Sequence, residues 1–108
     1  MAPFIVIVGY PNKPDARFDN DFYIKHHMMH VAEVWGPKGM RSWSVIKPLE
    51  DGHNMLLQVV ITWESMEAWK AAGASPEAKQ IFADIPKFTN IEPTMVKGEV
   101  IGAWSFSG

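Results

Sequence analysis

The sequence predicts an α+β fold in which four strands form one antiparallel sheet and two helical segments cover one of its faces. Runs of β-branched and apolar residues indicate the strands, and apolar residues at helical spacing indicate the helices. These segments follow one another in the order β, α, β, β, α, β. A length of 108 residues fits one domain, so we expect a single domain over residues 1–108.

The first half of this pattern opens with an apolar strand over residues 4–10, which ends at a proline. A loop rich in Pro, Asn and Asp follows. Asp19 or Asn20 is suited to cap the next helix, because a side-chain oxygen there accepts backbone N–H groups that have no intrahelical partner. We expect that helix to continue to about residue 35 and to end at the following Gly-Pro pair.

The second half contains two strands, a broken helix and a last strand. Residues 40–48 and 54–63 alternate between two faces, and an Asp-Gly turn joins them. Ser65 is suited to cap a helical segment that is interrupted at residues 73–76. The last strand is predicted over residues 94–101.

This order of elements is the split βαβ, or ferredoxin-like, arrangement. Each βαβ crossover is right-handed, so both helical segments should lie on the same face of the sheet. With 108 residues, nothing is left to cover the opposite face. Two such sheets packed face to face would bury both open faces, and we therefore predict a homodimer with two-fold symmetry.

Composition excludes several classes of protein and of site. The formal net charge is −2, and the basic residues do not form the stripe typical of nucleic-acid binding. The absence of cysteine excludes disulfides, thiolate catalysis and cysteine-held metals. There is no glycine-rich phosphate loop or nucleophile elbow. No leader pattern or membrane-spanning run is apparent, so we expect a cytoplasmic protein with no nucleic-acid or membrane partner.

Three of the four histidines lie within five positions of the first predicted helix. Helical spacing places one of them, His27, on a face with Tyr23, Val31 and Val34. Burial among apolar and aromatic side chains tunes the proton affinity of an imidazole, as a general acid or base near neutral pH requires. The alternative is a structural histidine that bonds a backbone carbonyl.

The neighbouring histidines allow a different reading. His26 and His30 stand four residues apart, the spacing that two zinc ligands use on a helix. Glu33 or His53 would have to supply a third ligand, and the sequence does not single out either of them. We therefore expect no metal site and no cofactor.

Other residues are candidates for contacts with a ligand. The phenol of Tyr10 ends the first strand and could reach a ligand oxygen. Trp43 and Trp63, which we assign to inner strands, could stack on a flat ring. Asp84 follows the second helical segment and could orient a histidine. Packing or capping is the alternative role for each of these residues.

The segment FDNDFYIKHHMMHV resembles the helix of EthD-type proteins, which reads FD-x-DYY-x-x-x-HMPLV. In register, Tyr23 takes the position of the second tyrosine and His27 that of the histidine. Further blocks are similar to the family in the same order: WGPKGMRSW, TWESMEAWKAA, SPEAKQIFADIPKFTN and GEVIG. The resemblance spans nearly the whole chain and implies a dimeric α/β barrel, in which two ferredoxin-like units pair through their sheets.

Two departures from the family pattern concern the same helix. The family's Pro-Leu after His-Met is Met29-His30 here, so we expect an uninterrupted helix with one additional imidazole. His26 replaces a residue that is more often small or polar. Either change would reshape the pocket and alter which group carries the proton.

The resemblance implies chemistry without a cofactor on aromatic or polyketide-like substrates of secondary metabolism. We expect a lyase or isomerase that catalyses decarboxylation, dehydration, cyclisation or isomerisation. In this reading His27 transfers a proton, while Tyr23, Tyr10 or His30 donates a hydrogen bond to a carbonyl or enolate oxygen. Val31 and Val34 would form part of an apolar wall. The alternatives are a haem- or metal-dependent oxidoreductase or monooxygenase, and a non-catalytic ligand-binding accessory protein.

Overall fold

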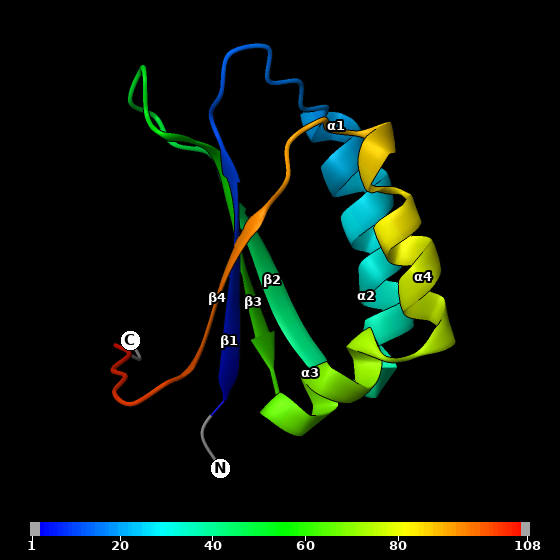
Figure 1. Cartoon of the computed structure of the whole chain (residues 1–108). Helices are drawn as coiled ribbons and strands as arrows, with labels where there is room; N and C mark the ends of the chain where they lie inside the picture. Colours follow the sequence, from blue (N-terminus) through cyan, green and yellow to red (C-terminus); the bar gives the residue numbers. More distant parts are fainter. Residues whose placement is uncertain (1–2, 107–108) are drawn as a thin grey trace.

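The computed structural model describes residues 3–106 and has the predicted α+β architecture (Figure 1). The strands are β1 (Phe4–Pro11), β2 (Met40–Ile46), β3 (Met55–Trp63) and β4 (Thr94–Glu99). They form one antiparallel sheet in the order β2-β3-β1-β4, with β1 and β3 in the centre. This order is that of a split βαβ unit, so the ferredoxin-like prediction is confirmed.

The helices form a layer on one face of that sheet (Figure 1). A first continuous segment contains α1 (Asn20–Phe22), the π-helix η1 (Tyr23–Met28) and α2 (Met29–Trp35), followed by the 3₁₀ turn η2 (Gly36–Lys38). The second segment contains α3 (Met66–Gly73), α4 (Pro76–Ala83) and the 3₁₀ turn η3 (Ile85–Lys87). The break predicted at residues 73–76 therefore separates α3 from α4.

The core lies between the helices and the sheet. On β3 every second residue is buried, as expected when one face of a strand packs inward: Leu57, Val59, Ile61 and Trp63. Their partners on β1 share this face, with Val6 opposite Ile61 and Val8 opposite Val59. The apolar alternation in the sequence therefore identifies the residues that form the inner face of the sheet.

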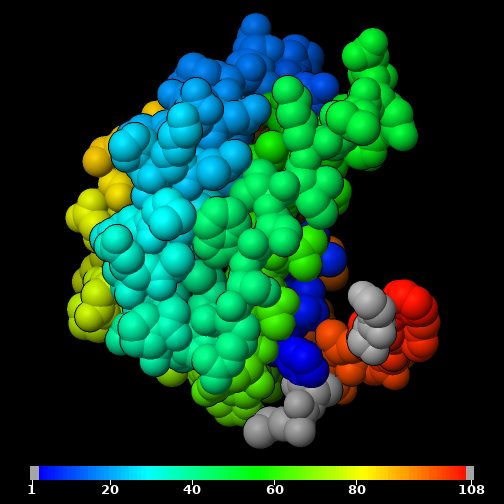
Figure 2. All heavy atoms as spheres, turned by 180° about the vertical axis from the view of Figure 1, so that it is seen from behind, coloured from blue at the N-terminus to red at the C-terminus, as the bar shows by residue number. Residues whose placement is uncertain are grey.

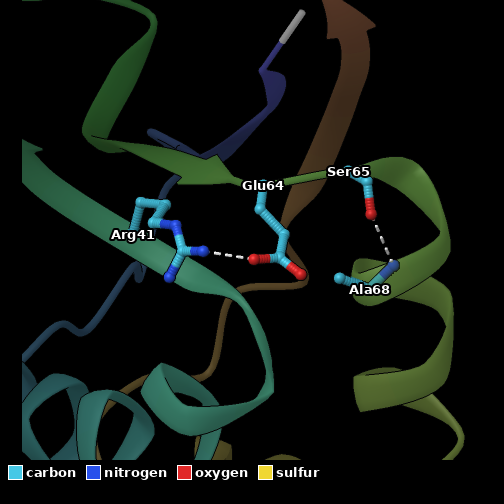
Figure 3. Close-up of polar contacts among 4 residues, drawn as sticks. All are labelled: Arg41, Glu64, Ser65 and Ala68. Atoms are coloured by element: carbon cyan, nitrogen blue, oxygen red, sulfur yellow. Dashed lines mark hydrogen bonds and ion pairs between the residues drawn. The ribbon is translucent and has the colours of Figure 1, made fainter. Parts of the chain in front are cut away.

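The junction between β3 and α3 is held by local contacts (Figure 3). The hydroxyl of Ser65 accepts a hydrogen bond of 3.1 Å from the backbone N–H of Ala68, which confirms the predicted cap. Arg41 and Glu64 form an ion pair beside it (Figure 3). Gly39 has a φ of +118°, and a Cβ there would lie 2.8 Å from the Cβ of Ala68, so this turn requires glycine.

The winding of the first helical segment differs from the prediction. Asp19 caps it through a 3.0 Å hydrogen bond that its carboxylate accepts from the N–H of Phe22. Over Tyr23–Met28, however, the segment is a π-helix rather than an uninterrupted α-helix. Helical spacing in a sequence does not distinguish i→i+4 from i→i+5 bonding over a few residues. Within this turn the adjacent residues His27 and Met28 are both buried.

The opposite face of the sheet carries apolar side chains that no helix of residues 3–106 covers (Figure 1). The register assigns this face the residues that alternate with the core: Ile5, Ile7, Leu56, Val60 and Val96. The β2–β3 hairpin and the segment after β4 project on this side and leave a recess between them (Figure 2). Both projections expose apolar side chains, Leu49 on the hairpin and Ile101, Trp104 and Phe106 on the C-terminal segment. In the part of the chain that is described, no helix has the length and apolar character needed to cross a bilayer.

Candidate functional site

A cavity of about 360 Å³ lies between the helical layer and the inner face of the sheet. This volume falls in the range of pockets that bind small molecules, roughly 300–1,000 Å³. Most of the wall is apolar, with contributions from Val6, Val8, Met28, Val31, Ile61, Ile81, Ile85 and Met95. The side chains that can hydrogen-bond come from Tyr10, Tyr23, His27, Trp35, Trp69 and Lys70.

His27 is the histidine that lines this cavity, and its side chain is 8% exposed. Its ring stacks on Tyr23, with 5.6 Å between ring centres, and packs 4.7 Å from the ring of Phe88. The Nδ1 atom is buried and has no hydrogen-bond partner among the described residues. A buried polar atom without a partner costs about 1–3 kcal/mol, so an oxygen of a bound ligand that reached it would be stabilised.

Two phenols flank this imidazole. The rings of Tyr10 and Tyr23 are nearly perpendicular, with centres 5.7 Å apart, and both side chains are buried. Burial raises the pKa of Tyr10, and a hydrogen bond with Tyr23 partly opposes that rise. Burial, followed by the neighbouring Tyr10, raises the pKa of Tyr23 far above its ordinary value. Both phenols therefore keep their protons at neutral pH. The hydroxyl of Tyr23 donates to that of Tyr10, which leaves the Tyr10 hydroxyl available to donate to a ligand.

The pKa of His27 is lowered from its ordinary value of 6.5, chiefly because burial disfavours the charged ring. The carboxylate of Asp84 opposes this effect, and the nearby His30 adds to it. Neutral imidazole is therefore the main form at pH 7. In that form the ring has one nitrogen that can accept a proton and one that can donate.

This lowered pKa predicts how stability depends on pH. His27 binds a proton less readily in the folded protein than in the unfolded chain, so protonation favours unfolding. The free energy of unfolding should hold its full value above about pH 6.5 and fall as the pH drops toward the folded pKa. Asp84 contributes at lower pH, because its folded pKa lies below 3.8. Urea unfolding of wild type and His27→Phe between about pH 5 and 7.5 measures the effect, and parallel pH profiles would contradict it.

The other histidines, together with Glu33 and Val34, do not line the cavity. His30 and Val34 are half-buried and do not line it. His26 and Glu33 are exposed, and His53 accepts a 3.0 Å hydrogen bond from the N–H of Met55 in the β2–β3 hairpin. Within residues 3–106 no three His, Asp or Glu side chains are grouped so that they could hold a metal ion.

Asp84 acts on His27 through space and does not line the cavity. Its carboxylate accepts a 3.0 Å hydrogen bond from the amide of Gln80 and forms a 3.0 Å ion pair with Lys87. The hydrogen bond from Lys87 is the largest of the causes that lower the pKa of Asp84. The side chain is therefore a partnered, ionised group at the end of α4.

The two tryptophans predicted on inner strands have different positions. Trp63 does end a central strand, but it is 1% exposed and packs against Trp35 rather than lining the cavity. Trp43 lies on β2, which is an edge strand, so its predicted inner position is wrong. Alternation along a strand indicates which side chains share a face, but it does not give the order of strands in the sheet.

Three residues of functional interest were not identified from the sequence. Phe88 is fully buried, and its ring packs against the rings of His27 and Tyr23. The buried Nε1 of Trp35 has no hydrogen-bond partner among the described groups, and Trp35 lines the cavity. Lys70 also lines it. The sequence hint for Trp35 is its position eight residues after His27, which helical spacing places close to the same face.

Solved structures of EthD-type proteins are similar to this chain. An EthD-like protein from Ralstonia eutropha JMP134 is 26% identical, with a TM-score of 0.84 over 97% of this chain and 97% of that one. An ethyl tert-butyl ether D (EthD) family protein from Bacillus halodurans C-125 is 18% identical, with a TM-score of 0.71 over 92% of this chain and 99% of that one.

A more distant structure shares the arrangement of helices and strands. A dimeric ferredoxin-like protein of unknown function from Thermobifida fusca YX is 11% identical, with a TM-score of 0.59 over 92% of each chain. Neither a protein-family model nor a curated protein matches the sequence. The EthD-type fold that the helix motif predicted is confirmed by these structures.

Proposed function

Taking the EthD-type fold as the frame, we propose that this protein is a cofactor-independent lyase or isomerase that moves a proton on an apolar, aromatic or polyketide-like substrate. The observation that carries the proposal is His27, a buried imidazole with an unpartnered nitrogen. It lies beside the protonated phenols of Tyr10 and Tyr23 on the wall of an apolar cavity. A base and hydrogen-bond donors meet there in a site of low polarity.

The first step is proton abstraction by the neutral ring of His27. The proton moves from a carbon next to a carbonyl group of the substrate to an imidazole nitrogen, and the electron pair of the C–H bond forms an enolate. The enolate oxygen accepts a hydrogen bond from the hydroxyl of Tyr10, which in turn accepts one from the hydroxyl of Tyr23 at this end of the cavity. Such bonds are stronger in an apolar site than in water, so they lower the barrier to enolate formation.

The second step returns the proton from the imidazolium. In a cyclisation the enolate carbon attacks a second carbonyl carbon of the substrate, and the new alkoxide takes the proton. In a dehydration a hydroxide leaves from the carbon next to the enolate and takes the proton as water. In a decarboxylation the ring first takes the proton of the carboxyl group of a β-keto acid, the C–C bond then breaks to release CO₂ and form the enolate, and the enolate carbon takes the proton back from the imidazolium. Because burial disfavours the charged ring, proton return restores the preferred neutral state.

The test is incubation of the purified protein with short poly-β-keto acids and their thioesters, followed by mass spectrometry. Each reaction is run with and without EDTA. Accelerated loss of CO₂ or water, or formation of a ring, that persists in EDTA supports the proposal. Binding without conversion would point to an accessory protein, and conversion that needs added iron or haem would point to an oxidoreductase; either result would contradict it.

The same proposal includes a homodimer that pairs through the open face of the sheet. This face presents Ile7 between Val60 and Val96 of the neighbouring strands. The recess beside it lies between the β2–β3 hairpin and the C-terminal segment (Figure 2), and these two segments contain the exposed Leu49 and Trp104. Contiguous apolar surface of this kind is typical of protein interfaces, and a second copy offers the same surface in return.

The dimer gives a direct prediction for a matched pair of variants. Ile7→Lys places a charge on the open sheet face, where a partner would bury it without a counter-ion, so the dimer should dissociate. Ile24→Lys makes the same change at an exposed site on the helical layer and should leave the dimer intact. Sedimentation velocity measures both. A monomeric wild type, or a dimeric Ile7→Lys protein, would contradict the proposed interface.

A further inference from the structure

The cavity has two chemically different ends, and the proposed proton transfer uses one of them. At that end His27, Tyr23 and Phe88 pack together, and the ring of Tyr10 contacts Tyr23. Tyr10 is near the end of β1, opposite Leu57. This end of the cavity therefore lies where β1 finishes.

The second end lies where β1 begins. Trp35 contacts Trp63, whose strand partner on β1 is Phe4. Phe4 in turn contacts Trp69, with 5.4 Å between ring centres, and Trp69 and Lys70 both line the cavity. These contacts place Trp35 and Trp69 at the same end, away from the Tyr10 phenol, and Lys70 follows Trp69 directly on α3.

The separation between the two ends sets the length of a ligand that reaches both. His27 and Trp35 are eight residues apart on one helical segment, which corresponds to about 12 Å at roughly 1.5 Å per residue. On the facing wall Val6 and Tyr10 are four residues apart on β1, or about 13 Å. Between the ends the cavity wall is aliphatic, with Val8 and Val31 facing the space.

Polar groups at the second end have no partner among residues 3–106. The Nε1 atom of Trp35 is buried and makes no hydrogen bond to any described residue. Lys70 is an exposed residue and the only formally charged side chain among the described residues of the cavity wall, and no carboxylate lies within ion-pair distance of it there. An indole N–H and an ammonium group are both donors, and together they suit an anionic oxygen pair.

The surroundings of Lys70 add a second cation and two anions. Lys97 of β4 lies over the ring of Trp69, with its nitrogen 5.1 Å from the ring centre. A groove that adjoins the cavity at Trp69 contains both lysines together with Glu67 and Glu99. Neither glutamate lines the cavity itself, so the charge presented to a ligand inside it is positive.

We propose that the site takes an elongated, largely apolar carboxylate, whose carboxylate group binds Lys70 and the Nε1–H of Trp35 while its reacting carbonyl or phenol end lies at His27. This inference rests on the proposed function, because it assigns the opposite end of the same substrate. It adds a class of molecule: a chain or ring system with an oxygen function at one end and an acid about 12 Å away. An aliphatic midsection fills the space between them.

The test compares a medium-chain ω-(4-hydroxyphenyl)alkanoic acid with its methyl ester by isothermal titration calorimetry at neutral pH. Wild type should bind the acid about tenfold more tightly than the ester, since a hydrogen bond to a charged group exceeds one between neutral groups. Lys70→Met keeps the apolar stem and removes the charge, so it should remove this preference and leave affinity for the ester unchanged. Trp35→Phe removes the N–H and should reduce the preference about threefold or more.

Lys79→Met on α4 is the matched control, because Lys79 is exposed and does not line the cavity. It should retain the full preference for the acid. Equal binding of acid and ester to wild type, an intact preference in Lys70→Met, or no binding of either probe would overturn the inference. His27→Phe should still prefer the acid in this titration. A failure at Lys70 is therefore distinct from a failure of proton transfer, which appears in turnover alone.

Discussion

Replacing His27 by phenylalanine should slow turnover of the substrate by about a hundredfold to ten-thousandfold, the range of a single general acid–base step. The reason is that the phenyl ring keeps the packing against Tyr23 and Phe88 but carries no proton. The variant should remain folded, because it replaces a buried nitrogen without a partner by an apolar atom of similar size. Steady-state kinetics, together with an unfolding curve for each protein, measures both expectations.

The adjacent His26 provides a control for the substitution of His27. His26 is exposed on the same π-helical turn, and His26→Phe should leave turnover within about twofold of wild type, as expected for a surface substitution. A third variant, His27→Gln, keeps a hydrogen-bonding group but cannot act as the base, and it should be as slow as His27→Phe. Turnover within a few-fold of wild type in a folded His27→Phe protein would rule out His27 as the proton carrier.

The largest effect on stability is expected at Phe88. Its ring is fully buried, with ring-centre distances of 4.7 Å to His27, 4.8 Å to Tyr23 and 5.4 Å to Phe18. Phe88→Ala removes a side chain that joins η3 to the first helical segment, and it should reduce the free energy of unfolding by about 3–5 kcal/mol. Urea unfolding at matched protomer concentration measures the loss.

The same substitution at an exposed phenylalanine provides the comparison. Phe106 is 81% exposed after β4, and Phe106→Ala should change stability by no more than about 0.5 kcal/mol. The Phe88→Ala protein should also show a His27 pKa closer to 6.5, because water would reach a ring that packing now excludes from solvent. A loss below about 1 kcal/mol at Phe88 would mean that the aromatic cluster can close over the gap.

The fold could be predicted because each element carries its own local evidence. Alternation over β3 identifies its buried face, and the cap at Ser65 and the break before Pro76 locate α3 and α4. The order of elements then allows few topologies, since crossovers are right-handed. The expected ends of the strands differ from the observed ones by one or two residues.

The site could be predicted only where its residues share one local element. Tyr23, His27 and Val31 recur at helical spacing, and all three line the cavity. Lys70 and Phe88 come from segments far along the chain, and their positions at the two ends of the site depend on how α3 and η3 pack against the sheet. The edge position of Trp43 likewise depends on strand order, which the sequence pattern does not encode.

The π-helical turn at Tyr23–Met28 has a consequence for how related chains can diverge. A deletion of one residue there would return the turn to ordinary α winding and rotate everything before it relative to α2. The imidazole at position 27 would then exchange surroundings with a neighbour such as Lys25 or His26, while the strands stayed in place. A ferredoxin-like fold of this type can thus acquire or lose a buried imidazole through a single codon, without any change in its architecture.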